Sequence, residues 1–153
     1  MTAIPAAARY RERLSPGPWM FIALLLLVPA VMLVVTPLNP ALAVPIGVMA
    51  YAAVAGSLVL FAPVVRVEHG ELTAGAARIP ITVLGEAEAL GRDGLREAIG
   101  PGLDARSYLL VRGYIHRAVR IDVRDPADPA PCWIITTRRP DELIAAIDAA
   151  RSG

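Results

Sequence analysis

The pattern of hydrophobic and charged residues changes abruptly near residue 66. Residues 14–65 contain no Asp, Glu, Lys, Arg or His, whereas charged residues recur throughout residues 66–153. The apolar run is too long for one membrane crossing. Residues 36–40 divide it into pieces of about 19 and 22 residues, close to the roughly 20 that span a bilayer. The pattern predicts an α-helical transmembrane hairpin over residues 14–65 and a small α+β domain over residues 66–153.

Prolines mark the predicted ends of the two helices. Ser15-Pro16 is typical of an N-cap followed by proline at the first helical position, and Asn39-Pro40 repeats this pattern. We therefore expect one helix to end near Thr36 and a second to run from about residue 41 to about residue 62. Pro29 predicts a kink in the first.

The second predicted helix is rich in small residues spaced four apart, which allow two helix backbones to approach closely. The pairs are Ala43/Gly47, Ala52/Gly56 and Ala53/Ser57. We expect these pairs to face the first helix. The alternative is a homo-oligomer in which Gly47, Ala52 and Gly56 face another copy of the chain.

Arginines flank the apolar run on both sides and predict its orientation. Arg9, Arg11 and Arg13 precede it and Arg66 follows it, while residues 36–40 carry no charge. Positively charged flanks stay in the cytoplasm. We therefore expect a multi-pass protein of the cell membrane, with both termini cytoplasmic and residues 1–13 forming a cytoplasmic N-terminal segment.

A secretory signal is the alternative to a first transmembrane helix. Residues 41–43 resemble a small-residue cleavage site that follows an arginine-flanked apolar segment. However, that segment is longer than the roughly 7–15 residues of a signal-peptide core. Even after cleavage the second span would leave the tail in the cytoplasm.

From residue 64 the apolar residues alternate with charged ones, which is typical of strands. His69-Gly70 has the form of a two-residue hairpin turn. In residues 118–124 three apolar side chains point one way and three charged side chains the other, which predicts a sheet with one exposed face. Further strands are expected at residues 77–80, 82–90, 108–112 and 132–137.

The other segments of the domain predict an elaborated loop, a stiff connection and a final helix. Residues 92–105 are too rich in Gly and Pro for a long helix and allow one short turn at residues 93–99; residues 125–131 form a proline-stiffened connection. A helix starts at Pro140, with Leu143, Ile144, Ile147 and Ala150 forming an apolar stripe. The core is expected from this stripe together with Trp133, Ile121, Val111 and Leu84.

About seven short strands followed by an amphipathic helix is the element order of a pleckstrin-homology-like (PH-like) domain, a bent antiparallel sheet with a C-terminal helix. A plain α+β sandwich is the alternative.

Composition excludes some classes of partner. The net charge is +1, and residues 66–153 carry nearly equal numbers of Arg and acidic residues, so we expect no nucleic-acid binding. Cys132 is the only cysteine and cannot form an intramolecular disulfide, in keeping with a reducing compartment.

No sequence motif for catalysis or cofactor binding is present. His69, His116 and Cys132 lie far apart in the sequence and form no close ligand pair, so we expect no metal site. Residues 100–102 lack the Lys-Ser/Thr of a phosphate-binding loop, and there is no Gly-x-Ser-x-Gly elbow. We therefore expect no catalytic residues, no cofactor and no enzymatic activity.

Three arginines are the candidates for contact with an anion or a lipid headgroup: Arg66, Arg138 and Arg139. The last two precede a helix N-terminus, whose free N–H groups attract a phosphate or a partner's carboxylate. The alternative is that they pair with Asp141, Glu142 or acids at a strand edge. A specific phosphoinositide site is not expected, because the loop joining the first two strands is only His69-Gly70.

Several short motifs resemble those of the actinobacterial domain-of-unknown-function family 3093. They are residues 10–14 (YRERL), 66–67 (RV), 70–72 (GEL), 78–80 (RIP), 118–120 (AVR), 125–129 (DPADP), Trp133 and 137–140 (TRRP). The chain departs from the family pattern at Gly113-Tyr114, where the family tends to have Pro-Trp. The resemblance implies a small membrane protein with two helices and a cytoplasmic tail, and it implies no established activity.

Two functions are compatible with these features. The first is a membrane-anchored module on the inner face of the plasma membrane that binds an unknown protein partner by strand addition. The second is a structural or accessory subunit of a larger membrane complex. A small membrane enzyme is a third class, for which the sequence has no motif.

Overall fold

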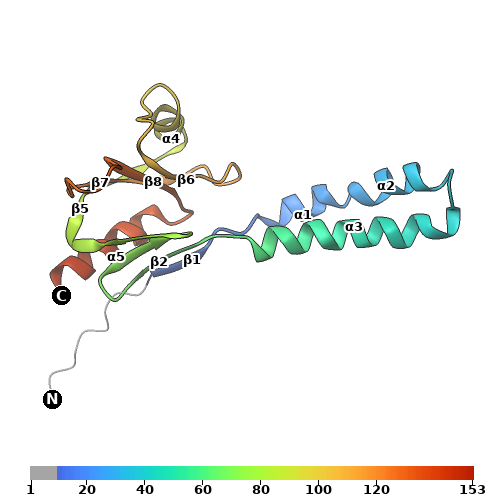
Figure 1. The fold of residues 1–153 in the computed structure, drawn as a ribbon, viewed down its shortest axis with the longest axis horizontal. Helices are drawn as coiled ribbons and strands as arrows, with labels where there is room; N and C mark the ends of the chain where they lie inside the picture. The colour runs from blue at the N-terminus through green and yellow to red at the C-terminus, as the bar shows by residue number, and fades with distance from the viewer. Residues whose placement is uncertain (1–9) are drawn as a thin grey trace, which may run out of the picture. The chain divides into compact units, whose positions relative to one another are not determined.

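The computed structural model describes residues 10–153 (Figure 1). Its contacts divide the chain into two compact units, one of residues Ser15–Ala62 and one that joins the residues up to Leu14 with Pro63–Gly153. We call them the helical unit and the domain. Residues 10–14 are therefore part of the domain and do not form a separate segment.

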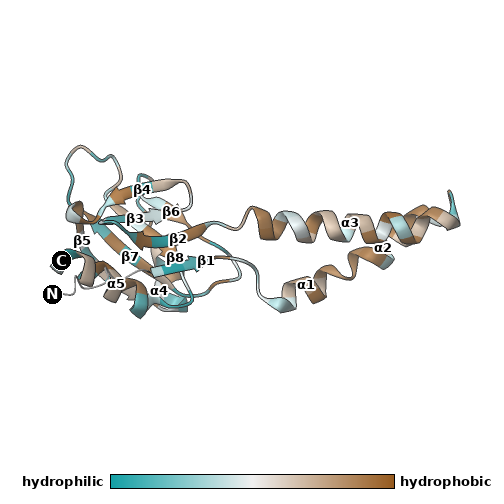
Figure 2. Cartoon of the chain, turned by 90° about the horizontal axis from the view of Figure 1, so that it is seen from below, coloured by the Kyte–Doolittle hydropathy of each residue, from teal (hydrophilic) through white to brown (hydrophobic). Residues whose placement is uncertain are grey.

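The helical unit contains α1 (Pro18–Leu24), α2 (Leu27–Val35) and α3 (Pro40–Leu60). The stretch Pro18–Val35 and helix α3 are each long and apolar enough to cross a membrane. Figure 2 shows the hydrophobic colouring along these helices. The prediction of two apolar helices is confirmed.

The break between α1 and α2 lies one helical turn before Pro29. Proline has no N–H to donate to the carbonyl four residues earlier, and its ring crowds that carbonyl. The carbonyl of Leu25 instead accepts from the N–H of Val28 at 3.1 Å, in a tighter turn. The kink expected from Pro29 is thus a short interruption at Leu25 and Leu26.

The predicted N-cap is wrong for the first helix and correct for α3. The Ser15-Pro16 cap is wrong: α1 begins at Pro18, with Gly17 at the N-cap. Pro18 fits the first helical position equally well, because its fixed φ suits the helix and its missing N–H costs nothing. The Asn39-Pro40 cap is confirmed, since the Asn39 side chain accepts a hydrogen bond from the N–H of Ala41 at 3.1 Å.

The small-residue pairs of α3 differ in their surroundings. Ala43 and Gly47 are buried, and a Cβ at Gly47 would lie 3.1 Å from the carbonyl oxygen of Val28. A Cβ at Gly56 would meet nothing within 4 Å. The prediction that these pairs face the first helix therefore holds for Ala43/Gly47 and is wrong for Ala52/Gly56.

The first sheet of the domain combines a strand from before the helical unit with three from after it. Strand β1 (Tyr10–Arg13) pairs with β2 (Val64–Glu68), which pairs with β3 (Glu71–Ala74), which pairs with β4 (Ala77–Pro80), all antiparallel. The N–H of Leu14 donates to the carbonyl of Pro63 at 2.9 Å, just beyond the β1–β2 ladder. The sequence did not predict β1, because three of its four residues are charged.

The turn between β2 and β3 is the predicted two-residue hairpin. His69 and Gly70 have φ values of 54° and 75°. Positive φ at both central residues is the type I′ geometry, which matches the twist of the flanking strands.

The second sheet has the order β5-β7-β8-β6. Its strands are β5 (Leu84–Leu90), β6 (Tyr108–Leu110), β7 (Ala118–Val123) and β8 (Cys132–Thr136), and a 3₁₀ turn, η1 (Ile81–Val83), precedes β5. Strands β6 and β8 run parallel, whereas the other pairs are antiparallel. All the strands predicted after residue 64 are present with small shifts at their ends.

Helix α4 (Arg92–Ile99) occupies part of the segment that was expected to be a loop. Gly94 lies inside this helix at a cost of about 1 kcal/mol relative to alanine. Leu95 and Ala98, three residues apart, are buried in a cluster with residues of β7 and β8, and this burial offsets the cost. The short helical turn allowed at residues 93–99 is thus present as α4, and it is longer than the single turn expected.

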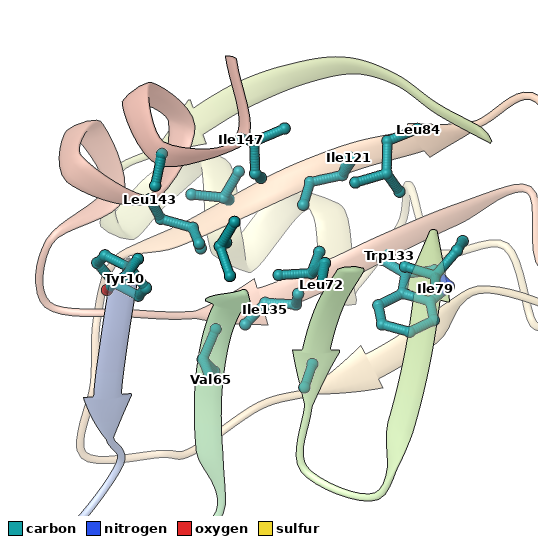
Figure 3. Packing of buried hydrophobic residues seen from close by; sticks show 14 of the residues in the cluster. Tyr10, Val65, Leu72, Ile79, Leu84, Ile121, Trp133, Ile135, Leu143 and Ile147 are labelled. Carbon is teal, nitrogen blue, oxygen red and sulfur yellow. The ribbon is translucent and has the colours of Figure 1, made fainter. Parts of the chain in front are cut away.

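The main core lies between the first sheet, the second sheet and helix α5 (Pro140–Ser152) (Figure 3). Leu143 and Ile147 of α5 are fully buried and point towards the strands, while Ile144 and Ala150 of the predicted stripe are partly buried. Trp133, Ile121 and Leu84 belong to this cluster as predicted. Val111 does not, because β6 ends at Leu110.

The domain is thus a small α+β domain with two mainly antiparallel sheets. The strands form two four-stranded sheets. The first sheet includes β1, and the second includes the parallel pair β6–β8. These features depart from the single bent antiparallel sheet that we expected, and the PH-like relationship stays a prediction.

Candidate functional site

A buried carboxylate joins the start of the domain to the start of α5. Glu12 of β1 has a side chain only 6% exposed. Its Oε2 atom accepts from the hydroxyl of Thr137 at 2.5 Å, and its Oε1 atom accepts from the backbone N–H of Arg138 at 3.1 Å. The guanidinium of Arg138 lies 3.7 Å from Oε1. A buried charge is costly unless it is hydrogen-bonded and paired, and Glu12 meets both conditions.

Tyr10 completes this cluster from the same strand. Its hydroxyl lies 2.7 Å from Oε2 of Glu12, to which it donates, and 2.8 Å from the hydroxyl of Thr137. Burial raises the pKa of Tyr10 well above its ordinary value, and the neighbouring Glu12 carboxylate adds to the rise. We call Tyr10, Glu12, Thr137 and Arg138 the Glu12 cluster.

Arg139 lies at the edge of the Glu12 cluster. It is the N-cap residue of α5, and its guanidinium pairs with Glu142 at 2.9 Å and donates to the carbonyl of Arg11 at 3.4 Å. The same guanidinium lies 5.4 Å from the centre of the Tyr10 ring. The Glu142 pair is about half exposed on both sides, so it adds little stability.

Arg66 lies on the neighbouring strand. It is opposite Arg11 in the β1–β2 ladder, and its guanidinium is 3.7 Å from Glu68. The structure therefore brings Arg138 and Arg139 to β1, and Arg66 to the strand beside it. Each of the three arginines has an acidic partner. For Arg138 and Arg139 this agrees with the alternative stated above, in which the two residues pair with acidic side chains. Anion binding by these residues stays a prediction.

The soft-metal ligands do not meet. His69 is exposed in the β2–β3 turn, His116 is exposed before β7, and Cys132 is buried with its sulfur 3.1 Å from the hydroxyl of Ser107. Within residues 10–153, no three His, Cys, Asp or Glu side chains gather in a way that could hold a metal ion.

A groove of about 640 Å³ lies beside η1, the start of β5 and the end of α5. Arg151 lines it, pairs with Asp148 at 3.1 Å, and donates to the carbonyls of Leu84 and Gly85. Arg151 is thus held in place by the carbonyls of the bulged start of β5. Its role in the groove is to fix the end of α5 to the second sheet.

Sequence reasoning missed Tyr10 and Glu12. The signal that could have found them is the alternation of residues 10–13, in which Tyr10 and Glu12 are buried while Arg11 and Arg13 are exposed. That two-residue period is typical of a strand, but the charge of the segment suggested only a membrane flank.

Comparison with known proteins gives one match. Neither the curated proteins nor the solved structures contain a match to the chain. Residues 9–147 match a family described as "Protein of unknown function (DUF3093)". The matched range begins just before β1 and ends within α5, so it includes both units and every residue of the Glu12 cluster. Because the match covers most of the chain, this protein belongs to the DUF3093 family.

Proposed function

We propose that this protein is a two-pass membrane protein whose domain serves as an interaction module on the inner face of the plasma membrane. One observation carries the proposal: β1 precedes the two apolar helices, β2 follows them, and the two strands pair directly. The chain must therefore leave the domain and return to it. If the helices cross a bilayer, both of their outer ends emerge on the same side.

The surface of the helical unit supports its insertion into lipid. Large apolar side chains that would be buried in the core of a soluble protein are highly exposed here, among them Ile22 (72%), Leu26 (72%) and Leu33 (81%). Exposing a continuous apolar surface of this kind to water is unfavourable, and hydrocarbon removes the cost.

The arginines at the ends of the hairpin support the cytoplasmic side. Arg11, Arg13 and Arg66 lie on the two strands that connect to the helices, and the loop between α2 and α3 carries no charge. Short positively charged flanks remain in the cytoplasm. We accordingly propose that both termini are cytoplasmic. Arg9, which was counted with these arginines, lies outside the described residues.

Reporter fusions test this topology. A reporter that is active only outside the cytoplasm should be active when inserted at residue 38 and inactive when fused after residue 153. The reverse result, or activity at both sites, would contradict the proposal.

The second sheet offers an edge for a protein partner. Strand β5 is at the edge of its sheet, and Glu86, Glu88 and Ala89 are exposed on it. An edge strand presents unpaired backbone groups to a partner strand. The other edge strands, β1, β4 and β6, are shorter. We propose strand addition at β5 as the mode of binding and no enzymatic activity.

A photocrosslinking residue tests the edge. Placed at Glu88, it should capture a protein in membranes, whereas at Ala145, on the exposed face of α5, it should not. Equal capture at both positions would exclude β5 as the binding edge.

The second candidate function is an accessory subunit that assembles through α3. Gly56 supports it, because a Cβ there would meet nothing within 4 Å, so this face of α3 is open to another helix. The other helix could belong to a second copy, with Ala52 and Gly56 at the contact; Gly47 packs against α2 instead.

Replacing the hairpin separates the two functions. Residues 15–62 would be exchanged for an unrelated two-span hairpin, so that the domain stays anchored. If the protein is an interaction module, the same partners should be retrieved after the exchange. If it is an accessory subunit that assembles through α3, these partners should be lost.

A further inference from the structure

The outer face of the first sheet carries a row of arginines that crosses all four strands. Arg11 is opposite Arg66, Arg66 is opposite Thr73, and Thr73 is opposite Arg78. Residues directly opposite in a ladder point to the same face of the sheet. We call Arg11, Arg66 and Arg78, with Thr73 between them, the arginine row.

This face is exposed to solvent. The next residues along the strands, such as Val65, Val67 and Leu72, point into the core, whereas Arg11 and Arg78 are exposed and Arg66 is 40% exposed. Among residues 10–153, the structure records an ion pair in this row only for Arg66, with Glu68 at 3.7 Å. An exposed pair of this length is weak and can exchange its partner.

Charge on this face is sorted along the strand direction. Arg13 and Val64 are opposite each other and lie on one side of the row, at the end of the strands that connects to α1 and α3. On the other side lie Glu68 and Glu71, also opposite each other. Positive charge is therefore concentrated at the end of the sheet joined to the apolar helices, and negative charge lies one row farther away.

We propose that the arginine row binds anionic phospholipid headgroups at the surface of the bilayer in which the hairpin is anchored. This inference rests on the proposed membrane anchor. Arg66 is only six residues after Leu60, the end of α3, so the chain cannot carry it more than about 21 Å away. Successive rows on one face are about 7 Å apart, so the acidic row can lie beyond the headgroups while the arginine row reaches them.

The sorting of charge favours a flat anionic surface over other occupants. A nucleic acid laid along the strands would meet Glu68 and Glu71 as well as the arginines. A membrane approached from the helix-connected end meets only the arginines. Guanidinium groups suit phosphate because their paired N–H donors can bind two oxygens at once.

The test uses the full-length chain in vesicles, with Thr73→Cys as a probe in the middle of the row. The rate of its labelling by a water-soluble maleimide is compared between phosphatidylcholine vesicles and vesicles with about one third phosphatidylglycerol. The chain without Thr73→Cys gives the background from buried Cys132. Because an arginine near an anionic surface favours the docked state about fivefold, three should make docking dominant.

The expected result is labelling that is at least fivefold slower in the anionic vesicles. This protection should disappear in the R11Q/R66Q/R78Q variant and in high salt. It should persist in the matched variant R92Q/R96Q/R117Q, which loses the same charge from exposed positions outside the first sheet. Equal labelling in both kinds of vesicle, or loss of protection in both variants, would overturn the proposal.

Two controls distinguish failure of the lipid-binding proposal from failure of the proposed membrane anchor. Resistance of the protein to carbonate extraction tests the anchor alone, and a chain that is extracted refutes the anchor. The extracted chain can then be added to preformed anionic vesicles, where the same labelling of Thr73→Cys still tests the arginine row. Soluble heparin is added to the phosphatidylcholine vesicles in a parallel reaction. If heparin protects Thr73→Cys as well as the anionic lipid does, the row is a general polyanion site and the assignment to lipid fails.

Discussion

The helical unit and the domain bury their apolar residues to very different degrees. In the domain, α5 and the two sheets enclose a continuous cluster that includes Leu72, Ile121, Ile135 and Leu143. In α1 and α2 no residue is buried, and in α3 only Ala43 and Gly47 are. The domain therefore has a buried core of its own, whereas the helices leave most of their apolar side chains exposed, which is what the proposed membrane anchor would cover.

The two units also differ in how their segments follow one another in sequence. The helices of the helical unit are consecutive, whereas the first sheet of the domain pairs β1 with a strand on the far side of both apolar helices. The hairpin is thus an insertion within an antiparallel meander. Changes in the domain should therefore act through its core and the Glu12 cluster, and changes in the helical unit through the α2–α3 contact.

The largest effect is expected from Trp133→Ala. Trp133 is 4% exposed, and its ring centre lies 4.4 Å from that of Tyr108. Emptying this site should lower the free energy of unfolding by about 3–5 kcal/mol. Thermal unfolding of the full chain in detergent, followed by circular dichroism, measures the loss. Leu109→Ala, on the adjacent β6 strand and 39% exposed, should cost far less. Equal losses would mean that the core is elsewhere.

Glu12→Ala should be the next most destabilising. It removes the acceptor shared by the hydroxyls of Tyr10 and Thr137 and the N–H of Arg138. Leaving buried donors without partners should cost about 2–4 kcal/mol in the free energy of unfolding, measured in the same way. The exposed Glu88→Ala is the control, with an expected change within about 0.5 kcal/mol. A small effect of Glu12→Ala would show that β1 contributes little to the domain.

In the helical unit, Gly47→Leu should cost about 1–3 kcal/mol. A Cβ there would already lie 3.1 Å from a backbone oxygen of Val28, so a larger side chain must push α3 away from α2. Unfolding in a denaturing detergent, monitored by helicity, gives the change. Gly56→Leu should be nearly neutral because the space beside it is open. If Gly56→Leu is the more damaging change, α3 has a partner on that face.

The smallest effect concerns pH. The folded pKa of Tyr10 is raised, so the unfolded chain loses this proton first as the pH rises. The unfolded chain then binds fewer protons than the folded one, and the free energy of unfolding falls above a pH of about 10, the ordinary pKa of tyrosine. Melting temperatures between pH 8 and pH 11 should therefore decline more steeply for the wild type than for Tyr10→Phe. Parallel melting curves for the wild type and Tyr10→Phe would contradict a contribution of Tyr10 ionisation to stability.

The sequence was sufficient where a periodic pattern and a turn signal agreed. The alternation in β7, the type I′ turn at His69-Gly70 and the proline at the start of α5 fixed these elements, and the uncharged run fixed the two apolar helices. It was insufficient for β1, because three of its four residues are charged and the strand with which it pairs lies beyond both helices.

The candidate site was predicted only in part for the same reason. Arg138 and Arg139 were singled out as cations before a helix, but Glu12, the acid that pairs with Arg138, is separated from it by most of the chain. Helix α4 was expected only as one short turn because Gly94 and the glycines on either side of the helix argue against it, and the contacts of Leu95 and Ala98 with the second sheet decide in its favour. Such long-range contacts are not visible in local spacing.

The pairing of β1 with β2 also sets an order of events during synthesis. The ribosome releases Tyr10–Arg13 first, then both apolar helices, and only afterwards the strand to which Tyr10–Arg13 must pair. Until β2 has been made, β1 has no strand to pair with, and Glu12 lacks its donors from Thr137 and Arg138 until the last part of the chain follows. The first sheet can therefore be completed only after both apolar helices have been made, and a chain in which β1 and β2 fail to pair would leave an open strand edge for the cell's quality-control proteases to recognise.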